Sequence, residues 1–251
     1  MPIRLAVPKE TITNERRIAL EPGVAKKLAD MGVKVMMQKG AALGSHFSDE
    51  AFEGVDLVDD AASLYQQADV IFKVQPPTPE ELSQIKDGAV IVGFMAAHKN
   101  PDMIKALCEK SITSLAMELV PRISRAQSMD ALSSQSNIAG YRAVVEAAQH
   151  FGRFFTGQIT AAGKVPPAKV LVIGAGVAGL AAIGAAKSMG AIVRSFDTRP
   201  EVKEQVESMD AEFLMLDFED NEDGSGEGGY AKVMSEEFIK AEMELFAEQA
   251  R

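Results

Sequence analysis

A glycine-rich turn between two apolar runs holds the residues best suited to chemistry. The run Val170–Ile173 leads into Gly174-Ala175-Gly176-Val177-Ala178-Gly179, then into a small-residue helix pattern and a second apolar run that ends in Asp197. In a strand–turn–helix of this spacing, the first glycine allows a tight turn, the second lets backbone approach a pyrophosphate, and the third lets the helix pack close to the strand. The N-terminus of the helix favours an anion. The sequence therefore predicts that Gly174 to Gly179 bind a dinucleotide.

The acidic residue after the second apolar run predicts which dinucleotide. Asp197 is placed to accept hydrogen bonds from an adenosine ribose diol and to repel a 2′-phosphate, which favours NAD over NADP. Thr198 and Arg199 follow it and are counted with the cofactor-binding residues. A nearby arginine can serve NADP, but beside Asp197 we interpret Arg199 as a solvated charge at a helix start. Glycine clusters also occur where a helix simply crosses a sheet closely, and only the full strand–helix–strand–acid context favours the dinucleotide.

Composition excludes several other classes of protein. The 251 residues are 47% hydrophobic with a net charge of −10 and show no basic stripe, which argues against binding to nucleic acid. A single cysteine, Cys108, excludes an internal disulfide, and its helical pattern predicts a buried structural thiol. His46, His98 and His150 are not spaced as metal ligands, so no metal is expected. No signal peptide and no apolar run of membrane-spanning length is found, so we expect this segment to be soluble, without membrane insertion.

Two series of alternating strand and helix patterns must position these residues. The first series predicts a parallel sheet with helices on both faces. Its expected strands are 3–7, 33–37, 69–74, 89–94 and 112–117, and its expected helices are 23–31, 61–67, 79–85 and 102–109. Around the glycine turn, the second series predicts strands that end at Ile173, Asp197 and Met215, with helices at 138–151, 177–189, 201–209 and a C-terminal amphipathic helix. The fold class expected is α/β, with two Rossmann-like doubly wound parallel-sheet domains joined by a helix.

The domains are expected at 1–135, 136–165 (linking helix and turn-rich connection) and 166–251 (the dinucleotide-binding domain). Residues 119–135 are polar, without a strand or helix period, and by default form a domain connection. The second sheet has strands on only one side of the glycine-turn strand, so we expect it to be incomplete and the chain to be a fragment of a longer one. Residues 217–229 are acidic and glycine-rich, so a mobile loop is expected there. In the C-terminal helix, Ile239, Met243 and Phe246 are expected to pack on the sheet.

Two basic residues at the carboxyl edge of the first sheet leave two interpretations open. Arg17 follows the first strand, and Lys73 lies in the otherwise apolar run Val70–Val74. Open α/β sheets bind ligands at this edge. Alternatively, Lys73 reaches the sheet edge and pairs with a carboxylate.

Three stretches carry a resemblance to a known family. They are the loop from Pro121 to Ser134 (PRISRAQSMDALSS), the run from Phe154 to Pro167 (FFTGQITAAGKVPP) and the GAGVAG turn. With these, essentially the whole chain resembles the NAD(H)-binding domain I of proton-translocating NAD(P) transhydrogenase, the N-terminal part of the bacterial alpha subunit. Such members continue well past residue 251, so weak NAD binding would follow if the chain ends there.

The resemblance implies roles for the loop. Arg122, Asp130 and Ser133 match positions near the nicotinamide carboxamide, Gln127 matches one facing the NADP-bearing partner, and Tyr230 matches the tip of a mobile loop over NAD. It further implies an Si-type transhydrogenase that transfers hydride directly between NADH on this chain and NADP+ on a partner domain, coupled to proton translocation by a membrane domain. A homodimer at the cytoplasmic face of the bacterial inner membrane is expected from the same resemblance.

Two alternatives remain open. The sequence is also similar to alanine dehydrogenase, whose substrate-binding Arg and Lys are matched by Arg17 and Lys73. The catalytic His of that enzyme should fall near Met95, where this chain has none, and His98 is three residues late. Amino-acid dehydrogenation needs a general acid/base, whereas hydride transfer between two nicotinamides does not. The other alternative is a non-catalytic NAD-binding module.

Overall fold

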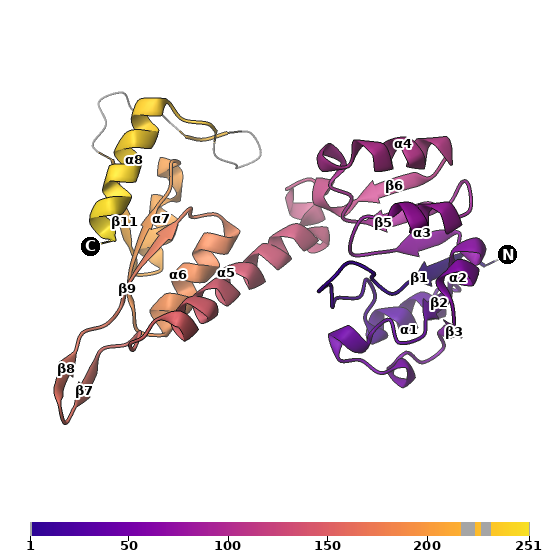
Figure 1. Ribbon diagram of the computed structural model, residues 1–251, viewed down its shortest axis with the longest axis horizontal. Coiled ribbons are helices and arrows are strands. Elements are labelled where there is room, and N and C mark those ends of the chain that lie inside the picture. Colours follow the sequence, from indigo (N-terminus) through magenta and orange to yellow (C-terminus); the bar gives the residue numbers. More distant parts are fainter. Residues whose placement is uncertain (1, 217–223, 227–231, 251) are drawn as a thin grey trace. The chain divides into compact units, whose positions relative to one another are not determined.

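In the computed structural model, the chain divides into two compact units, residues 1–130 and 131–251 (Figure 1). The structure describes residues 2–216, 224–226 and 232–250, so Tyr230 and most of the acidic loop lie outside the described residues. The second unit begins with the helix α5 (Ala131–His150). Residues 136–150 of this helix were expected to belong to a connection between the two domains.

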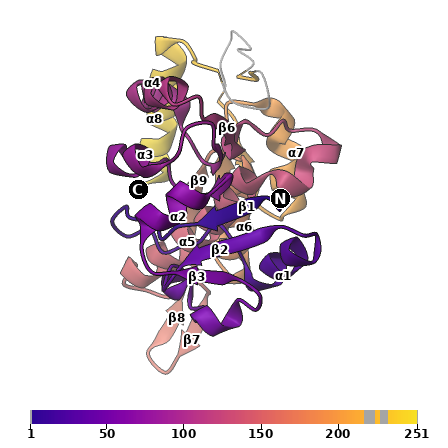
Figure 2. The same ribbon diagram turned by 90° about the vertical axis from the view of Figure 1, so that its right-hand side faces the viewer.

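A six-stranded parallel sheet forms the centre of the first unit. Its strand order is β3-β2-β1-β4-β5-β6, and β1, β2 and β3 lie side by side (Figure 2). The chain reverses direction across the sheet between β1 and β4, which is the switch point of a doubly wound fold. The parallel α/β prediction is confirmed, but β3 was not predicted, because it is a short, largely exposed edge strand without apolar alternation. The strands are β1 (Arg4–Val7), β2 (Lys34–Gln38), β3 (Asp56–Val58), β4 (Val70–Phe72), β5 (Val90–Gly93) and β6 (Thr113–Ala116).

Helices cover both faces of this sheet. Ala6 and Ile71 lie in a core with side chains of α2, α3 and α4, whereas Leu5 and Val7 lie in a second core with α1. Two buried faces explain why these strands read as continuous apolar runs. The helices are α1 (Pro22–Asp30), α2 (Ala61–Gln67), α3 (Pro79–Gln84) and α4 (Pro101–Glu109), with 3₁₀ turns η1 (Leu43–Ser45), η2 (Asp49–Ala51), η3 (Ala97–Lys99), η4 (Met117–Leu119) and η5 (Ser124–Met129).

In helix α4 of the first unit, the buried residue is not the one that the sequence pattern predicted. Cys108 in α4 is exposed, so the expected buried thiol is wrong. The helix instead turns Leu107 toward the core. Adjacent apolar positions in a short helix do not fix which of them faces inward.

The second unit is built on a three-stranded parallel sheet of order β11-β10-β9. This order matches the β3-β2-β1 half of the first sheet. The core between the sheet, α5, α6 and α7 contains Val144, Ile183, Val193 and Val206. The elements are α5, β7 (Gln158–Thr160), β8 (Gly163–Val165), β9 (Lys169–Ile173), α6 (Val177–Ser188), β10 (Ile192–Phe196), η6 (Pro200–Val202), α7 (Lys203–Ser208), β11 (Glu212–Leu214) and α8 (Glu236–Gln249).

One feature of the second unit was not predicted, and one expectation is wrong. The turn-rich run at 160–167 has its turn at residues 161–162, but this turn joins the antiparallel strands β7 and β8 of a hairpin that extends away from the parallel sheet (Figure 1). Residues 131–135, expected as loop, form the first turn and more of α5. These residues extend α5 at its N-terminal end, ahead of the segment in which Gly140 lies against the backbone of Ala178 at the start of α6.

The C-terminal helix packs on the sheet through a different face from the one expected. Phe238 is buried, and both Phe238 and Phe246 contact the ring of Phe196 on β10. Ile239 and Met243 are exposed. The i, i+4, i+7 pattern therefore identified the helix, and Phe246 on its packed face, but the aromatic side chains decide the rotation of the helix.

Candidate functional site

The glycine turn connects β9 to α6 with a different conformation at each glycine. Gly174 has a φ of +93°, in the region that favours glycine, and its amide donates to the carbonyl of Phe196 at 2.7 Å. Gly176 is the N-cap of α6, has an extended backbone and has nothing within 4 Å of where a Cβ would lie. The space above Gly176 can therefore admit a group that approaches the backbone closely.

The third glycine packs the helix against the turn. A Cβ on Gly179 would clash with the backbone carbonyl of Gly174 and would also approach Val172. Only a residue without a side chain allows α6 to begin this close to the end of β9. The N-terminal N–H groups of α6, Val177 and Ala178 among them, consequently sit directly beside the open space above Gly176.

The start of α6 is electrostatically suited to an anion. The helix has twelve residues, and its first turn contains no acidic side chain and no side-chain cap. Unpaired N–H groups of a first turn, together with the helix dipole, attract phosphate. The turn therefore has the chemistry of a phosphate-binding turn.

Asp197 follows β10 and is hydrogen-bonded to the turn itself. Its Oδ2 accepts from the backbone N–H of Ala175 at 2.6 Å. Its Oδ1 accepts from the backbone N–H of Arg199 at 2.9 Å. Burial raises the pKa of Asp197, but hydrogen bonds from Arg199 and Ala175 outweigh burial and hold this pKa below its usual value. The carboxylate is thus ionised at neutral pH and fixed against the glycine turn.

Arg199 is paired with Asp197, so the interpretation as a solvated charge is wrong. The Arg199 Nε donates to Oδ1 and Nη2 donates to Oδ2, both at 2.8 Å. The Arg199 side chain is only 12% exposed and that of Asp197 only 5%. The Asp-x-Arg spacing is the signal that could have revealed this pair from the sequence. Thr198 lies between the two, with its carbonyl accepting from Gly224 N–H at 3.1 Å.

The loop residues carried over from the resemblance lie around the end of the first unit. Arg122 and Gln127 are exposed, Gln127 within η5, and the Gln127 carbonyl accepts from the backbone N–H of Asp130. Ser133 lies in the first turn of α5, in the second unit. The structure describes the two units separately, so the meeting of these residues with the glycine turn at one nicotinamide stays a prediction.

Lys73 lies just past the end of β4, between two carboxylates. Its Nζ is 2.8 Å from Glu81 Oε1 and 3.3 Å from Glu10 Oε2, and its side chain is 1% exposed. Tyr65 donates its hydroxyl to the same Glu81 oxygen at 2.9 Å, and burial with the Glu81 charge raises the Tyr65 pKa. Of the two interpretations, pairing with carboxylates is the arrangement found, although the lysine is buried and does not reach solvent. The capping box Thr78-x-x-Glu81 was the sequence signal for one partner.

Arg17 belongs to the same edge of the first sheet. It pairs with Glu15 at 2.6 Å, and Glu15 also accepts from the side chain of Gln75 at 2.6 Å. Glu10 and Glu15 help to line a cavity of about 220 Å³ with Arg17. Buried carboxylates therefore accompany both basic residues that the sequence analysis singled out.

The position expected for a dehydrogenase histidine holds a buried methionine. Met95 is fully buried, and its backbone N–H donates to the Glu118 carboxylate. His98 is exposed in η3. The position that the comparison with alanine dehydrogenase assigns to the histidine therefore holds no imidazole.

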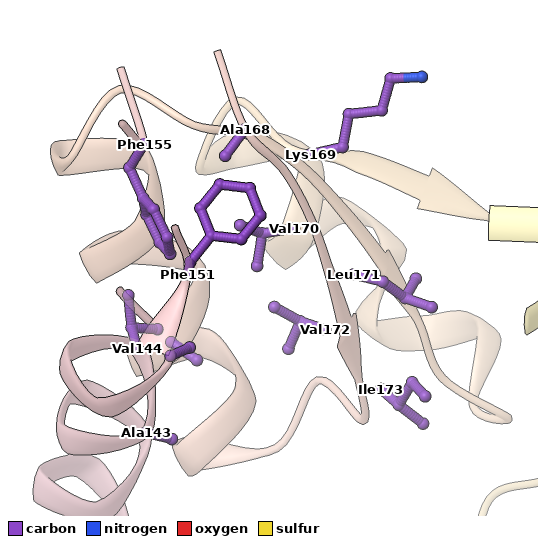
Figure 3. A pocket seen from close by; sticks show the side chains of 12 residues that line it. Ala143, Val144, Phe151, Phe155, Ala168, Lys169, Val170, Leu171, Val172 and Ile173 are labelled. Atoms are coloured by element: carbon purple, nitrogen blue, oxygen red, sulfur yellow. The ribbon is translucent and has the colours of Figure 1, made fainter. Parts of the chain in front are cut away.

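An apolar pocket of about 400 Å³ lies along β9 (Figure 3). Phe151 and Phe155 meet edge to face at one side of it, and Val170 and Val172 line it from the strand. The ammonium group of Lys169 points away from the pocket in Figure 3. Its lining has no group suited to phosphate, so the glycine turn remains the candidate site. Within the described ranges, no cluster of side chains could hold a metal ion, and no helix is both long and apolar enough to cross a membrane.

Comparisons with known proteins agree with this geometry. Residues 6–139 match the family described as alanine dehydrogenase/PNT, N-terminal domain, and residues 143–251 match its C-terminal domain. The chain is 58% identical over 248 residues to NAD(P) transhydrogenase subunit alpha of Haemophilus influenzae, covering 98% of this chain and 48% of that protein. It is 33% identical over 198 residues to alanine dehydrogenase of Methanococcus maripaludis, covering 77% of this chain and 52% of that enzyme.

Solved structures give the same result. A transhydrogenase from Sinorhizobium meliloti superposes with a TM-score of 0.81 at 45% identity, covering 85% of this chain and 64% of that one. An L-alanine dehydrogenase superposes with a TM-score of 0.74 at 25% identity, covering 84% and 60%. The chain spans about half the length of the curated relatives it matches. The resemblance found in the sequence is confirmed, and the chain belongs to the alanine dehydrogenase/PNT family, with transhydrogenase alpha subunits among its more similar relatives.

Proposed function

We propose that this chain is the NAD(H)-binding component of a proton-translocating NAD(P) transhydrogenase of the Si type. The observation that carries the proposal is the glycine turn, where a positive-φ glycine, an open glycine and a tightly packed glycine precede a helix N-terminus, with Asp197 fixed beside them. Gly174 to Gly179 would hold the pyrophosphate, and Asp197 the adenosine ribose. NADH on this chain would then pass hydride directly to NADP+ on a partner domain.

The chain contributes positioning in this reaction. Arg122, Asp130 and Ser133 would hold the nicotinamide carboxamide, and Gln127 would face the partner domain. Holding two rings in contact and excluding water can contribute about 7 to 11 kcal/mol through oriented proximity. We propose that proton translocation belongs to a membrane domain of the complex and that the chain forms a homodimer at the cytoplasmic face of the inner membrane.

A mixing experiment tests the proposal. The chain is combined with a separate NADP-binding transhydrogenase domain, and NADH-dependent reduction of an NADP analogue is followed. Arg122→Ala and Asp130→Ala should each slow hydride transfer by about 10- to 100-fold, the loss expected for one charged hydrogen bond. Arg142→Ala, which removes an exposed arginine from α5, serves as the matched control. Unchanged turnover in both loop variants would contradict the assignment.

Alanine dehydrogenase activity is the second candidate, supported by the fold match and by the Arg17 and Lys73 positions. Met95, buried where the histidine is expected, weighs against it. Reductive amination of pyruvate with ammonia and NADH distinguishes the two activities. NAD binding without transfer in either assay would support a non-catalytic module instead.

A further inference from the structure

We propose that Arg199 is a latch on the ribose-binding carboxylate and sets how strongly the site discriminates at the adenosine 2′ position. This inference rests on the proposed function, because it concerns the same NAD site. It goes beyond the proposed function because it assigns to Arg199 a role in selecting between NAD and NADP. The glycine turn and Asp197 alone do not explain this arginine.

The carboxylate of Asp197 is saturated in the absence of ligand. A carboxylate has about four lone-pair positions. Here Oδ1 accepts from Arg199 N and Nε, and Oδ2 accepts from Ala175 N and Arg199 Nη2, at 2.6 to 2.9 Å. The 5% exposure of this side chain leaves almost no surface for a sugar hydroxyl. A ribose diol can therefore reach Asp197 only after the guanidinium has moved away.

The four hydrogen bonds differ in how easily they can be released. Two come from the backbone, at Ala175 and Arg199, and they remain as long as the turn keeps its shape. The other two come from the Arg199 side chain, and these charge-assisted hydrogen bonds open when the side chain rotates away from Asp197. Exchange of these two bonds for two ribose hydroxyls would leave the carboxylate saturated and fixed. The bound site thus needs no rearrangement of β9, β10 or α6.

A released guanidinium changes the selectivity of the site. A lone Asp197 would repel a 2′-phosphate, but the pair of Asp197 and Arg199 carries no net charge. Guanidinium binds phosphate with two parallel hydrogen bonds. Arg199 therefore costs affinity for NAD, since its bonds to Asp197 must open, and it recovers part of the affinity for a 2′-phosphorylated dinucleotide. The latch weakens the discrimination that the carboxylate alone would give.

The experiment measures NADH and NADPH binding to the chain by nucleotide fluorescence, which is convenient because the sequence has no Trp. ADP-ribose and its 2′-phosphorylated form serve as competitors that lack the nicotinamide. Arg199→Met should tighten NADH binding several-fold and weaken NADPH binding. The Kd for NADPH divided by the Kd for NADH should therefore rise by about tenfold or more, as expected for a lost charged hydrogen bond. Arg194→Met, which removes an arginine paired with Glu212 on the same sheet, should leave the ratio unchanged.

Arg199→Lys keeps the charge without the two-pronged geometry and should give an intermediate ratio. It also provides the test if Arg199→Met does not fold. Wild-type NADH binding with an unaltered ratio in both Arg199 variants would overturn the latch while leaving the proposed function intact. Weaker NADH binding by Arg199→Met would overturn it as well, because the arginine would then support NAD. No response of the wild-type chain to NADH or ADP-ribose at millimolar concentration would overturn the proposed function and the latch with it.

Discussion

The three glycines of the turn allow stability and binding to be separated by two matched substitutions. Gly179→Ala places a methyl group against the backbone carbonyl of Gly174, which cannot rotate away as a flexible side chain could. Gly176→Ala places the same methyl group in open space, on a backbone with φ −75° and ψ −169° that alanine adopts without strain. The first change should therefore damage the fold, and the second should damage the site.

The magnitudes follow from opposing contributions. Alanine in a helix is favoured over glycine by roughly 0.5–1 kcal/mol, whereas overpacking costs about 1–3 kcal/mol, or more where backbone must move. For Gly179→Ala we expect a net loss of about 2 kcal/mol, which corresponds to a decrease in Tm of roughly 6–12 °C for a unit intermediate in size between 100 and 150 residues. For Gly176→Ala the exchange of a glycine N-cap for alanine should cost less than about 1 kcal/mol.

Urea unfolding followed by far-UV circular dichroism measures the first quantity, and NADH fluorescence titration measures the second. Gly176→Ala should bind NADH at least about tenfold more weakly at nearly unchanged stability, because its methyl group occupies the space proposed for the pyrophosphate. Gly179→Ala should lose stability first. Wild-type stability of Gly179→Ala would refute the packing argument. Wild-type NADH affinity of a folded Gly176→Ala would refute the assignment of the open space to a phosphate.

Three further predictions concern the first unit. Lys73→Met should destabilise the chain by about 3–5 kcal/mol, since it leaves two buried carboxylates unpaired; urea unfolding checks this, and the double variant with Glu81→Gln should recover part of the loss. Hydrogen bonds from Arg17, opposed by burial, lower the pKa of Glu15 from 4.5 to about 2, so its contribution to stability is present above pH 4.5 and is lost as the pH falls toward 2. Wild type should therefore be more stable than Glu15→Gln at neutral pH, with the gap in urea midpoint closing below pH 4.5; a gap independent of pH would contradict this. Cys108 is exposed and should react with a thiol reagent in the native state as fast as in urea, whereas slow labelling would show that it is covered.

The parallel sheets could be predicted because each strand leaves a strong local signal. A strand buried on both faces must be apolar throughout, as in Leu5–Val7, and a crossover helix must begin after a turn or cap residue, as at Pro22 and Thr78. The turn that begins at Gly174 adds a fixed spacing of glycines. The backbone conformation requires glycine at Gly174, and the close approach of α6 to the turn requires it at Gly179. These requirements act over a few residues and are therefore readable in the sequence.

The expectations that were wrong depend on contacts between distant residues. The rotation of α8 is decided by contacts of Phe238 and Phe246 with the ring of Phe196. The edge strand β3 forms because its backbone pairs with β2. Its side chains are largely exposed, so its sequence shows no alternation of apolar and polar residues. Arg199 was misjudged because it was interpreted as a charge at a helix start, and the carboxylate two residues earlier was not considered as its partner.

Each unit has a basic side chain at the carboxyl edge of its parallel sheet, Lys73 in the first and Arg199 in the second. The carboxylates that each one pairs with indicate whether its role is structural or whether a ligand can displace it. Lys73 neutralises Glu10 and Glu81, whose oxygens also hold the backbone N–H groups of Val74 and Thr78. Moving this lysine would leave two buried negative charges without a partner, so no small ligand is expected to displace it. Arg199 neutralises Asp197, whose carboxylate keeps two backbone hydrogen bonds when the guanidinium leaves. Both sets of acids keep backbone hydrogen bonds when their base moves, but loss of Lys73 leaves two buried negative charges and loss of Arg199 leaves that of Asp197, which a ribose diol can hydrogen-bond. The Asp197–Arg199 pair at the glycine turn is therefore the one that can open for a ligand.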